Sequence, residues 1–221
     1  MPWLLKLFLF CVAAVAILLI TAVSWLFFYS GDLPDVTSLA QFAPATNRSV
    51  SGPCLESASI AIPYEAMGGT FRNALSAAEV RLSFQISRTM FCTPSKVLNR
   101  QLTEVRTAAR LERHFSPQQL FTIYANRTYF GEGQIGVQSA SRYFFHKNPG
   151  ELGIAEAALL AGLAKGPSYL SPINHPDRAM TRRNEVIDAM LQAGAITASE
   201  AEVSKADPLG IVVSNVAPHA Q

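Results

Sequence analysis

Two stretches of this sequence place carboxylates close to arginines, a combination that can hold an anion and move a proton. In the first, Glu79 is followed closely by Ser83-Phe84-Gln85-Ile86-Ser87-Arg88-Thr89, which mixes hydroxyls, an amide and a guanidinium. In the second, Arg100 and Glu104 lie four residues apart. Such donors suit sugars and phosphates, and a positioned carboxylate can act as a general base. An Arg–Glu pair at this spacing is also a common surface ion pair, so a structural interpretation of the second stretch stays open.

The charge around these residues is strongly basic. Residues 72–113 hold eight basic and three acidic side chains, a local excess of +5 (8 − 3) in a chain whose net charge is +2. This excess favours an anionic partner, although a solvated basic helix face would give the same count. Phosphate groups of lipids or of a lipid-linked substrate fit better than nucleic acid if this region lies outside the membrane.

A long apolar run near the N-terminus supports that location. Leu7 to Phe28 is 22 residues without a charge, long enough for a helix to cross a bilayer core of about 30 Å. Lys6 precedes the run, whereas Asp32 and Asp35 follow it and no Lys or Arg occurs before Arg48. The positive-inside rule therefore puts the N-terminus in the cytoplasm. A cleaved signal peptide is the alternative, but its apolar core is usually about 7–15 residues.

Helix signals dominate the remaining chain, so the predicted fold class is mostly α. The predicted boundaries are a cytoplasmic stub and anchor over 1–30, a linker over 31–58, one domain over 59–210 and a tail over 211–221. Within the domain, Ser59–Ile62 is expected to form a short strand. The expected helices are Ala74–Glu79, Asn99–His114, a helix capped by Ser116, Ile154–Ala164, Pro176–Ala193 and a helix capped by Thr197.

The helix over Asn99–His114 is expected to bury one apolar face. Its apolar positions at helical spacing are Leu98, Leu102, Val105 and Ala109. Arg100 and Glu104 would then lie on the opposite side of the helix. Glu112, near the edge of the apolar face, could be a buried carboxylate that needs an arginine partner, which is a structural interpretation too.

The cysteines and histidines give weaker signals. Cys54 and Cys92 lie after the anchor and could form a disulfide or remain two free thiols. The four histidines are scattered, without the spacing of a zinc site, so no metal ligand is assigned. Gly131, Gly133 and Gly136 follow Tyr129 in a loop that needs positive φ or close backbone approach, or is a simple turn.

At these residues the sequence resembles the peptidoglycan glycosyltransferase family, which is found in class A penicillin-binding proteins and monofunctional transglycosylases. The resemblance covers roughly 60–209. It rests on RQLTE followed by RLE at residues 100–112, on FTIYANRTYFGEGQIGVQSASRYFFHK and on AEAALLAGLAKGPSYLSP. The resemblance implies a lysozyme-like glycosyltransferase domain behind a single transmembrane helix in the inner (cytoplasmic) membrane, with the domain on the extracytoplasmic side.

The front half departs from the family pattern. Ala77-Ala78-Glu79 keeps part of the first motif, but Val80 stands at the Asp position and no His or Gly follows. Residues 83–89 match only the end of the second motif, and Gln101 replaces the Lys of the third. The segment between the first two motifs, which forms a mobile jaw in the family, is missing.

Carried over by position, the resemblance implies roles for five residues. Glu79 matches the catalytic base, which takes the proton from the acceptor sugar's 4-hydroxyl as this attacks C1 of the donor. Glu104 matches the second essential Glu, which would stabilise the departing pyrophosphate through basic neighbours or a divalent cation, Mg or Mn. Gln85, Arg88 and Arg100 match substrate-binding positions.

The implied partners are lipid II, the nascent glycan strand, the membrane and other cell-wall synthesis proteins, with no nucleic acid. Because no penicillin-binding serine domain follows in this sequence, cross-linking is expected from another protein. A non-catalytic relative that binds glycan or wall-synthesis proteins is the main alternative, because the jaw is shortened. A lysozyme-like hydrolase is a further one, but it needs an acid beside a sugar leaving group, and no residue is singled out for that role.

Overall fold

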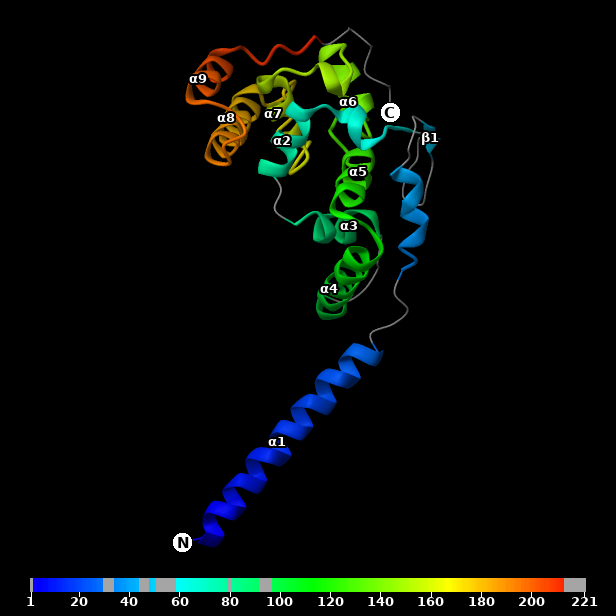
Figure 1. Ribbon diagram of the computed structural model, residues 1–221, viewed down its shortest axis with the longest axis vertical. Coiled ribbons are helices and arrows are strands. Elements are labelled where there is room, and N and C mark those ends of the chain that lie inside the picture. The colour runs from blue at the N-terminus through cyan, green and yellow to red at the C-terminus, as the bar shows by residue number, and fades with distance from the viewer. Residues whose placement is uncertain are drawn as a thin grey trace.

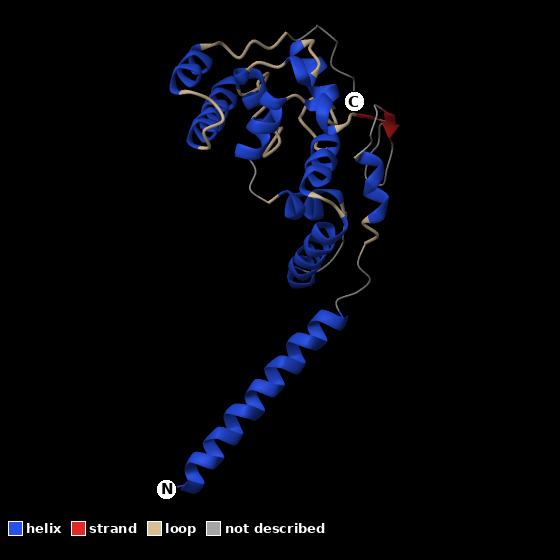
Figure 2. Cartoon of the chain, viewed as in Figure 1, coloured by secondary structure: helices blue, strands red, loops and turns tan. Residues whose placement is uncertain are grey.

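The computed structural model describes residues 2–29, 34–43, 48–50, 59–78, 81–91 and 97–212. Nearly all elements there are helical (Figures 1 and 2), which confirms the predicted class. The α-helices are α1 (Pro2–Tyr29), α2 (Gly69–Ala78), α3 (Leu82–Met90), α4 (Val97–His114), α5 (Pro117–Arg127), α6 (Val137–Phe145), α7 (Ile154–Leu163), α8 (Pro176–Gln192) and α9 (Ala198–Ala206). The other elements are 3-10 helices η1 (Thr37–Phe42), η2 (Tyr64–Met67) and η3 (Pro149–Glu151), and an antiparallel strand pair, β1 (Arg48–Val50) and β2 (Ser59–Ala61).

Helix α1 is long and apolar enough to cross a membrane, judged by its length and composition. Its most apolar window, Lys6–Ser24, has a mean hydropathy of 2.8, and none of that window is buried within the protein. The predicted apolar run, Leu7 to Phe28, falls entirely inside this helix.

Local capping signals locate the starts of two helices correctly. The Ser116 hydroxyl accepts a hydrogen bond from the Gln119 backbone N–H, and the Gln119 side chain accepts one from the Ser116 N–H, at the start of α5. Thr197 and Glu200 form the same reciprocal pair at the start of α9. Each pair satisfies N–H groups that the first helical turn leaves without intrahelical acceptors.

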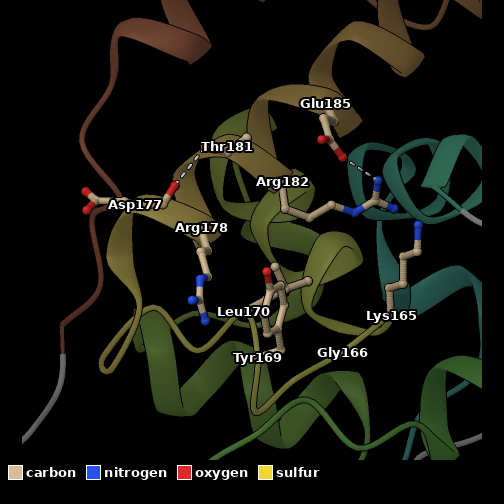
Figure 3. A pocket seen from close by; sticks show the side chains of 9 residues that line it. All are labelled: Lys165, Gly166, Tyr169, Leu170, Asp177, Arg178, Thr181, Arg182 and Glu185. Carbon is tan, nitrogen blue, oxygen red and sulfur yellow. Dashed lines mark hydrogen bonds and ion pairs between the residues drawn. The ribbon is translucent and has the colours of Figure 1, made fainter.

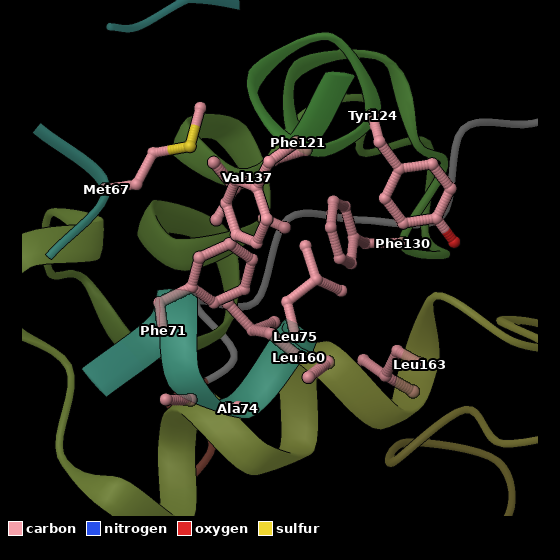
Figure 4. Packing of buried hydrophobic residues seen from close by; sticks show 14 of the residues in the cluster. Met67, Phe71, Ala74, Leu75, Phe121, Tyr124, Phe130, Val137, Leu160 and Leu163 are labelled. Atoms are coloured by element: carbon pink, nitrogen blue, oxygen red, sulfur yellow. The ribbon is translucent and has the colours of Figure 1, made fainter. Parts of the chain in front are cut away.

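The core forms where α2, α5 and α7 meet. Figure 4 shows Phe71 and Leu75 of α2 between aromatic side chains of the α5 region and leucines of α7. Helix α7 is almost wholly buried from Ala157 to Leu163, because α2 and α8 both pack against it. Its Ala-rich sequence permits this close approach on several sides. The Cβ of an alanine at Gly162 would lie 3.0 Å from Cγ of Arg182 on α8.

The segment expected to be a linker also contributes to the core. Val36, Leu39 and Phe42 are buried, and η1 packs against α5. Asn126, near the end of α5, fixes this contact, because its Nδ2 donates to the carbonyls of Phe42 and Ile62, both at 2.8 Å. Its Oδ1 accepts from the Ile62 N–H at 3.1 Å. One buried amide therefore ties η1 and the end of β2 to the helical core.

Two of the four positions of the predicted apolar face of α4 are exposed, and the side chains of the other two, Leu98 and Leu102, are not among those described. Val105 is 47% exposed and Ala109 is also exposed, whereas Thr103 and Thr107 are buried on the same helix. The buried face, Thr103, Thr107, Ala108 and Leu111, is the one turned toward its helical neighbours. Contact with α3 decides which face is covered, and that contact is partly polar, so the apolar pattern does not reveal it.

The structure excludes the buried alternative for Glu112. The side chain is exposed rather than buried, and its carboxylate accepts a 2.6 Å hydrogen bond from the Ser83 hydroxyl of α3. A serine therefore provides the contact that the buried alternative assigned to an arginine.

Helix α9 is held by a buried arginine. Arg183 of α8 has no exposed surface, and its guanidinium donates to the carbonyls of Lys205 at 2.9 Å and Asp207 at 2.7 Å. These carbonyls lie at the C-terminal end of α9, where a positive charge also interacts favourably with the helix dipole. Burial lowers the pKa of this guanidinium, and the nearby Asp207 carboxylate partly opposes that shift. Arg183 therefore fixes α9 to α8.

Candidate functional site

Two serines fix the orientation of α3. Ser83 donates to the Glu112 carboxylate, and Ser87, one turn later, donates to the backbone carbonyl of Glu104 at 3.0 Å. Both serines are buried and lie on the face of α3 turned toward α4. Because the later serine of α3 meets the earlier residue of α4, the two helices run antiparallel. This pairing turns other positions of α3 away from α4.

Among those positions, Gln85 and Arg88 line a cavity of about 590 Å³. Its other walls are formed by the end of α5, the loop after it and the segment that follows α7. A cavity of this size can hold a small-molecule substrate. The structure thus brings together two of the three residues that the sequence assigned to substrate binding.

The same cavity contains two cations that the sequence did not single out. Arg127 ends α5 and Lys165 follows α7, and both line the cavity with Arg88. Arg127 is 8% exposed, lies 4.9 Å from the ring centroid of Phe42 and has a pKa lowered by burial. Among the described residues, the lining has three cationic side chains and no carboxylate. This charge and partial enclosure suit an anion, such as a phosphate or pyrophosphate.

Arg127 and Lys165 lie inside the quoted motifs, in YANRTYFG and AGLAKGPSY, but only the packing of α5 and α7 against α3 brings them near Arg88. No local pattern marks either residue as part of a site.

Of the predicted carboxylates and Arg100, the structure describes only the side chain of Glu104. Glu104 is half-buried on α4, beside the face that packs on α3, and does not belong to the described lining of this cavity. Position 79 follows the end of α2 at Ala78 and lies outside the described residues. Arg100 is within α4, but its side chain is not among those described. The convergence of Glu79, Glu104 and Arg100 on one cleft therefore stays a prediction.

A tight loop after α5 shapes one wall of the cavity. Tyr129 and Ile135 form an isolated antiparallel bridge across it, and both line the cavity. Gly136 closes the loop with φ +84°, and a Cβ there would lie 2.7 Å from the carbonyl oxygen of Asn126. A residue with a side chain would be strained at Gly136 and would also displace the end of α5. The loop is therefore more constrained than a simple turn.

Within the described parts of the chain, no group of three or more His, Cys, Asp or Glu could hold a metal ion. These residues thus provide no ligand set for the divalent cation that the resemblance allows. Cys54 and Cys92 lie outside the described residues, so their pairing stays open. Cys11 in α1 is a free thiol.

Comparisons with a family model and with individual proteins point to the same family. A family model described as "Transglycosylase" matches residues 62–191. Penicillin-binding protein 1F of Bacillus subtilis is 37% identical over 147 residues, which cover 65% of this chain and 21% of that protein. Penicillin-binding protein 1A of Aquifex aeolicus is 37% identical over 131 residues, covering 59% of this chain and 18% of that protein.

A crystal structure of penicillin-binding protein 1A from Haemophilus influenzae aligns with 61% of this chain and 17% of that one. The identity is 25% and the TM-score is 0.40. The chain spans about a fifth of the length of these two penicillin-binding proteins.

Proposed function

This chain belongs to the transglycosylase family, and we propose from that membership that it is a glycosyltransferase that polymerises lipid II into peptidoglycan strands. The observation that carries the proposal is the cavity in which Gln85 lies with three cations, Arg88, Arg127 and Lys165, on the side of α3 away from α4. A lipid-linked sugar donor presents a pyrophosphate, and this lining matches its charge.

The proposed reaction is a displacement at C1 of the donor sugar. The 4-hydroxyl oxygen of the acceptor sugar forms the new bond to C1, and its proton passes to the Glu79 carboxylate. The bond from C1 to the pyrophosphate oxygen breaks, and its electron pair leaves with undecaprenyl pyrophosphate. A sugar hydroxyl is a poor nucleophile, so a positioned base contributes about 10²–10⁴-fold to the rate.

The cations stabilise the leaving group in this proposal. Negative charge grows on the pyrophosphate as the bond to C1 breaks, and Arg88, Arg127 and Lys165 would already be in place to meet it. Fixed cations in a partly enclosed cavity stabilise such charge without reorganisation. Gln85 would donate a neutral hydrogen bond to the same group. Glu104 on α4 would act on the leaving group only indirectly, by holding basic neighbours such as Arg100 in place, because a carboxylate repels a pyrophosphate.

The membrane supplies the substrate in this account. Helix α1 would anchor the chain in the inner membrane with its N-terminus in the cytoplasm, which leaves residues 34–212 on the extracytoplasmic face. The length and composition of α1 support this arrangement, as does the acidic flank that follows it. The lipid tail of the donor would then stay in the bilayer while its head group reaches the cavity.

A second candidate function is a non-catalytic one. Helix α2 ends at Ala78 and α3 begins at Leu82, so three residues join them. In the family this connection holds a longer jaw segment. A chain with so short a connection could bind glycan or wall-synthesis proteins without closing on a substrate.

Polymerisation of purified lipid II separates the two candidates. The full chain in detergent is expected to form glycan polymer, and Glu79→Gln is expected to abolish it while the circular dichroism spectrum stays unchanged. Absence of polymer from the wild-type chain, beside an active control enzyme, would favour the binding role. Full activity of Glu79→Gln would show that Glu79 is not the base.

A further inference from the structure

A second cavity, of about 600 Å³, lies between α8 and the segment that joins α7 to α8. Figure 3 shows Tyr169 and Leu170 on that segment opposite the first turns of α8, which carry Arg178 and Arg182. Lys165 lines both this cavity and the cationic cavity beside α3. The two cavities are therefore neighbours that share one wall residue.

An aromatic and a cationic group form the open side of this second cavity. The Tyr169 side chain is prominent at the surface, with 63% of the residue exposed. The guanidinium carbon of Arg178 lies 4.4 Å from the centroid of the Tyr169 ring. Exposed tyrosines suit contact with the apolar faces of sugars, because the ring offers a flat apolar surface with a polar tip. The stacked guanidinium keeps its N–H groups available at the edge of this platform.

Some of the charged side chains that line the second cavity are paired with each other, and others are not. Arg182 is paired with Glu185 at 2.8 Å, so these two largely cancel. Within the described residues, Arg178 and Lys165 are in no ion pair. Figure 3 shows the carboxylate of Asp177 directed away from Arg178 and Tyr169. Arg178 thus remains to receive a ligand's negative charge in this cavity, while Lys165 is shared with the cationic cavity, where it is assigned to the pyrophosphate.

Arg182 adds a further donor. Its Nε is buried and has no hydrogen-bond partner among the described residues. A buried donor without an acceptor is destabilising, so an acceptor on a bound ligand would be stabilising. The tight contact of Arg182 with Gly162 of α7 holds this side chain in place.

We propose that this second cavity binds the nascent glycan strand through its sugar rings and its carboxylates, with Tyr169 and Arg178 as the principal contacts. The inference rests on the proposed function, because a peptidoglycan strand repeats a muramic acid unit whose lactyl group, or the peptide attached to it, carries a carboxylate. A strand leaving the cationic cavity past Lys165 would place its next sugars on Tyr169. Holding the product there would favour repeated additions to one strand.

Fluorescence anisotropy with soluble tetrasaccharides tests the proposal on the full chain in detergent. The probe is a labelled tetrasaccharide of alternating N-acetylglucosamine and N-acetylmuramic acid with free lactyl carboxylates. A labelled N-acetylglucosamine tetramer, which has no carboxylate, is the neutral control. The carboxylated probe is expected to bind at least about tenfold more tightly, since a charge-assisted hydrogen bond contributes that much. The same tetrasaccharide with peptide stems shows whether lactyl or peptide carboxylates are preferred.

Two variants and a matched control locate the contact. Arg178→Gln is expected to lower the affinity for the carboxylated probe to that for the neutral one, and Tyr169→Ala to weaken both. Arg113→Gln removes the same charge from an exposed position at the end of α4 and is expected to bind like the wild type. Equal affinity for the two tetrasaccharides, or unchanged binding by Arg178→Gln, would overturn the proposal.

The outcomes also separate this inference from the proposed function. A chain that polymerises lipid II but does not distinguish the tetrasaccharides refutes the glycan site alone. Binding that depends on Arg178, in a chain that makes no polymer, supports the glycan site and refutes the catalytic proposal. If both hold, Tyr169→Ala is expected to shorten the polymer formed.

Discussion

Removal of the Asn126 amide is expected to detach the N-terminal segment from the helical core. The side chain is fully buried and makes three hydrogen bonds, to the carbonyls of Phe42 and Ile62 and to the Ile62 N–H. Asn126→Ala leaves these three backbone groups without this partner. A buried polar group that loses its partner costs about 1–3 kcal/mol. Because such losses are not additive, we expect a total of about 3–5 kcal/mol.

Hydrogen exchange measured by mass spectrometry reports this loss where it occurs. A destabilisation of about 3 kcal/mol corresponds to roughly a hundredfold faster exchange for amides protected by the docking. In the full chain in detergent, peptides covering 37–43 and 59–64 are expected to show it, while peptides from α8 change less. Gln118→Ala, an exposed position on the same helix, is the control and is expected to stay within about 0.5 kcal/mol.

Asn126→Asp refines the test. The carboxylate can still accept from the Ile62 N–H, but it cannot donate to either carbonyl and it buries a charge. At neutral pH this variant should therefore be at least as unstable as Asn126→Ala. Acidification protonates the carboxylate and restores one donor, so part of the loss should be recovered. Wild-type exchange at 37–43 and 59–64 in Asn126→Ala would refute the claim that this amide docks the segment.

Three further predictions concern helix ends and a loop. Arg183→Met removes the donors to the end of α9 and should lower the free energy of unfolding by about 2–4 kcal/mol. Amide hydrogens of α9 should then exchange faster. Unchanged protection of α9 would contradict the role of Arg183 in fixing α9 to α8. Gly136→Ala, at φ +84° with a carbonyl 2.7 Å from the new Cβ, should lower the melting temperature, whereas Gly133→Ala, with open space around its Cβ, should lower it less. Hydrogen bonds from Thr197 hold the pKa of Glu200 below its usual range, so this contribution to stability is present above the unfolded pKa of about 4.3. It is lost as the pH falls through the lower folded value. Glu200→Gln should therefore show a smaller loss of thermal stability than the wild type between about pH 5 and pH 3, and identical acid profiles would contradict this.

The sequence predicts those parts of the fold that depend on local interactions. The starts of α5 and α9 follow from Ser116 and Thr197, because a capping residue and its partner three positions later need no other element. The apolar run of α1 is equally local. Contacts over long sequence distances are different. The docking of Phe42 depends on Asn126, 84 residues later, and no pattern within the segment 31–58 reveals that partner.

The candidate site likewise contains residues that the sequence predicts and residues that only helix packing brings together. Motif positions predict Gln85 and Arg88 as site residues, and both line the cationic cavity. The sequence does not reveal Arg127 and Lys165, because helix packing rather than spacing in the sequence brings them to the cavity. The buried face of α4 is hidden from the sequence for a related reason. The helix buries Thr103 and Thr107 against its neighbours, so Val105 and Ala109, which the apolar pattern predicts as buried, are exposed instead.

The most direct test of the proposed chemistry compares two single-charge variants in lipid II polymerisation. Arg88→Ala removes a cation that lines the cavity, whereas Arg113→Ala removes one at the exposed end of α4. If Arg88 meets the charge of the leaving pyrophosphate, its loss should lower the rate by about 10²–10³-fold, while Arg113→Ala keeps the wild-type rate. Equal rates for the two variants would contradict the assignment of this cavity to the pyrophosphate.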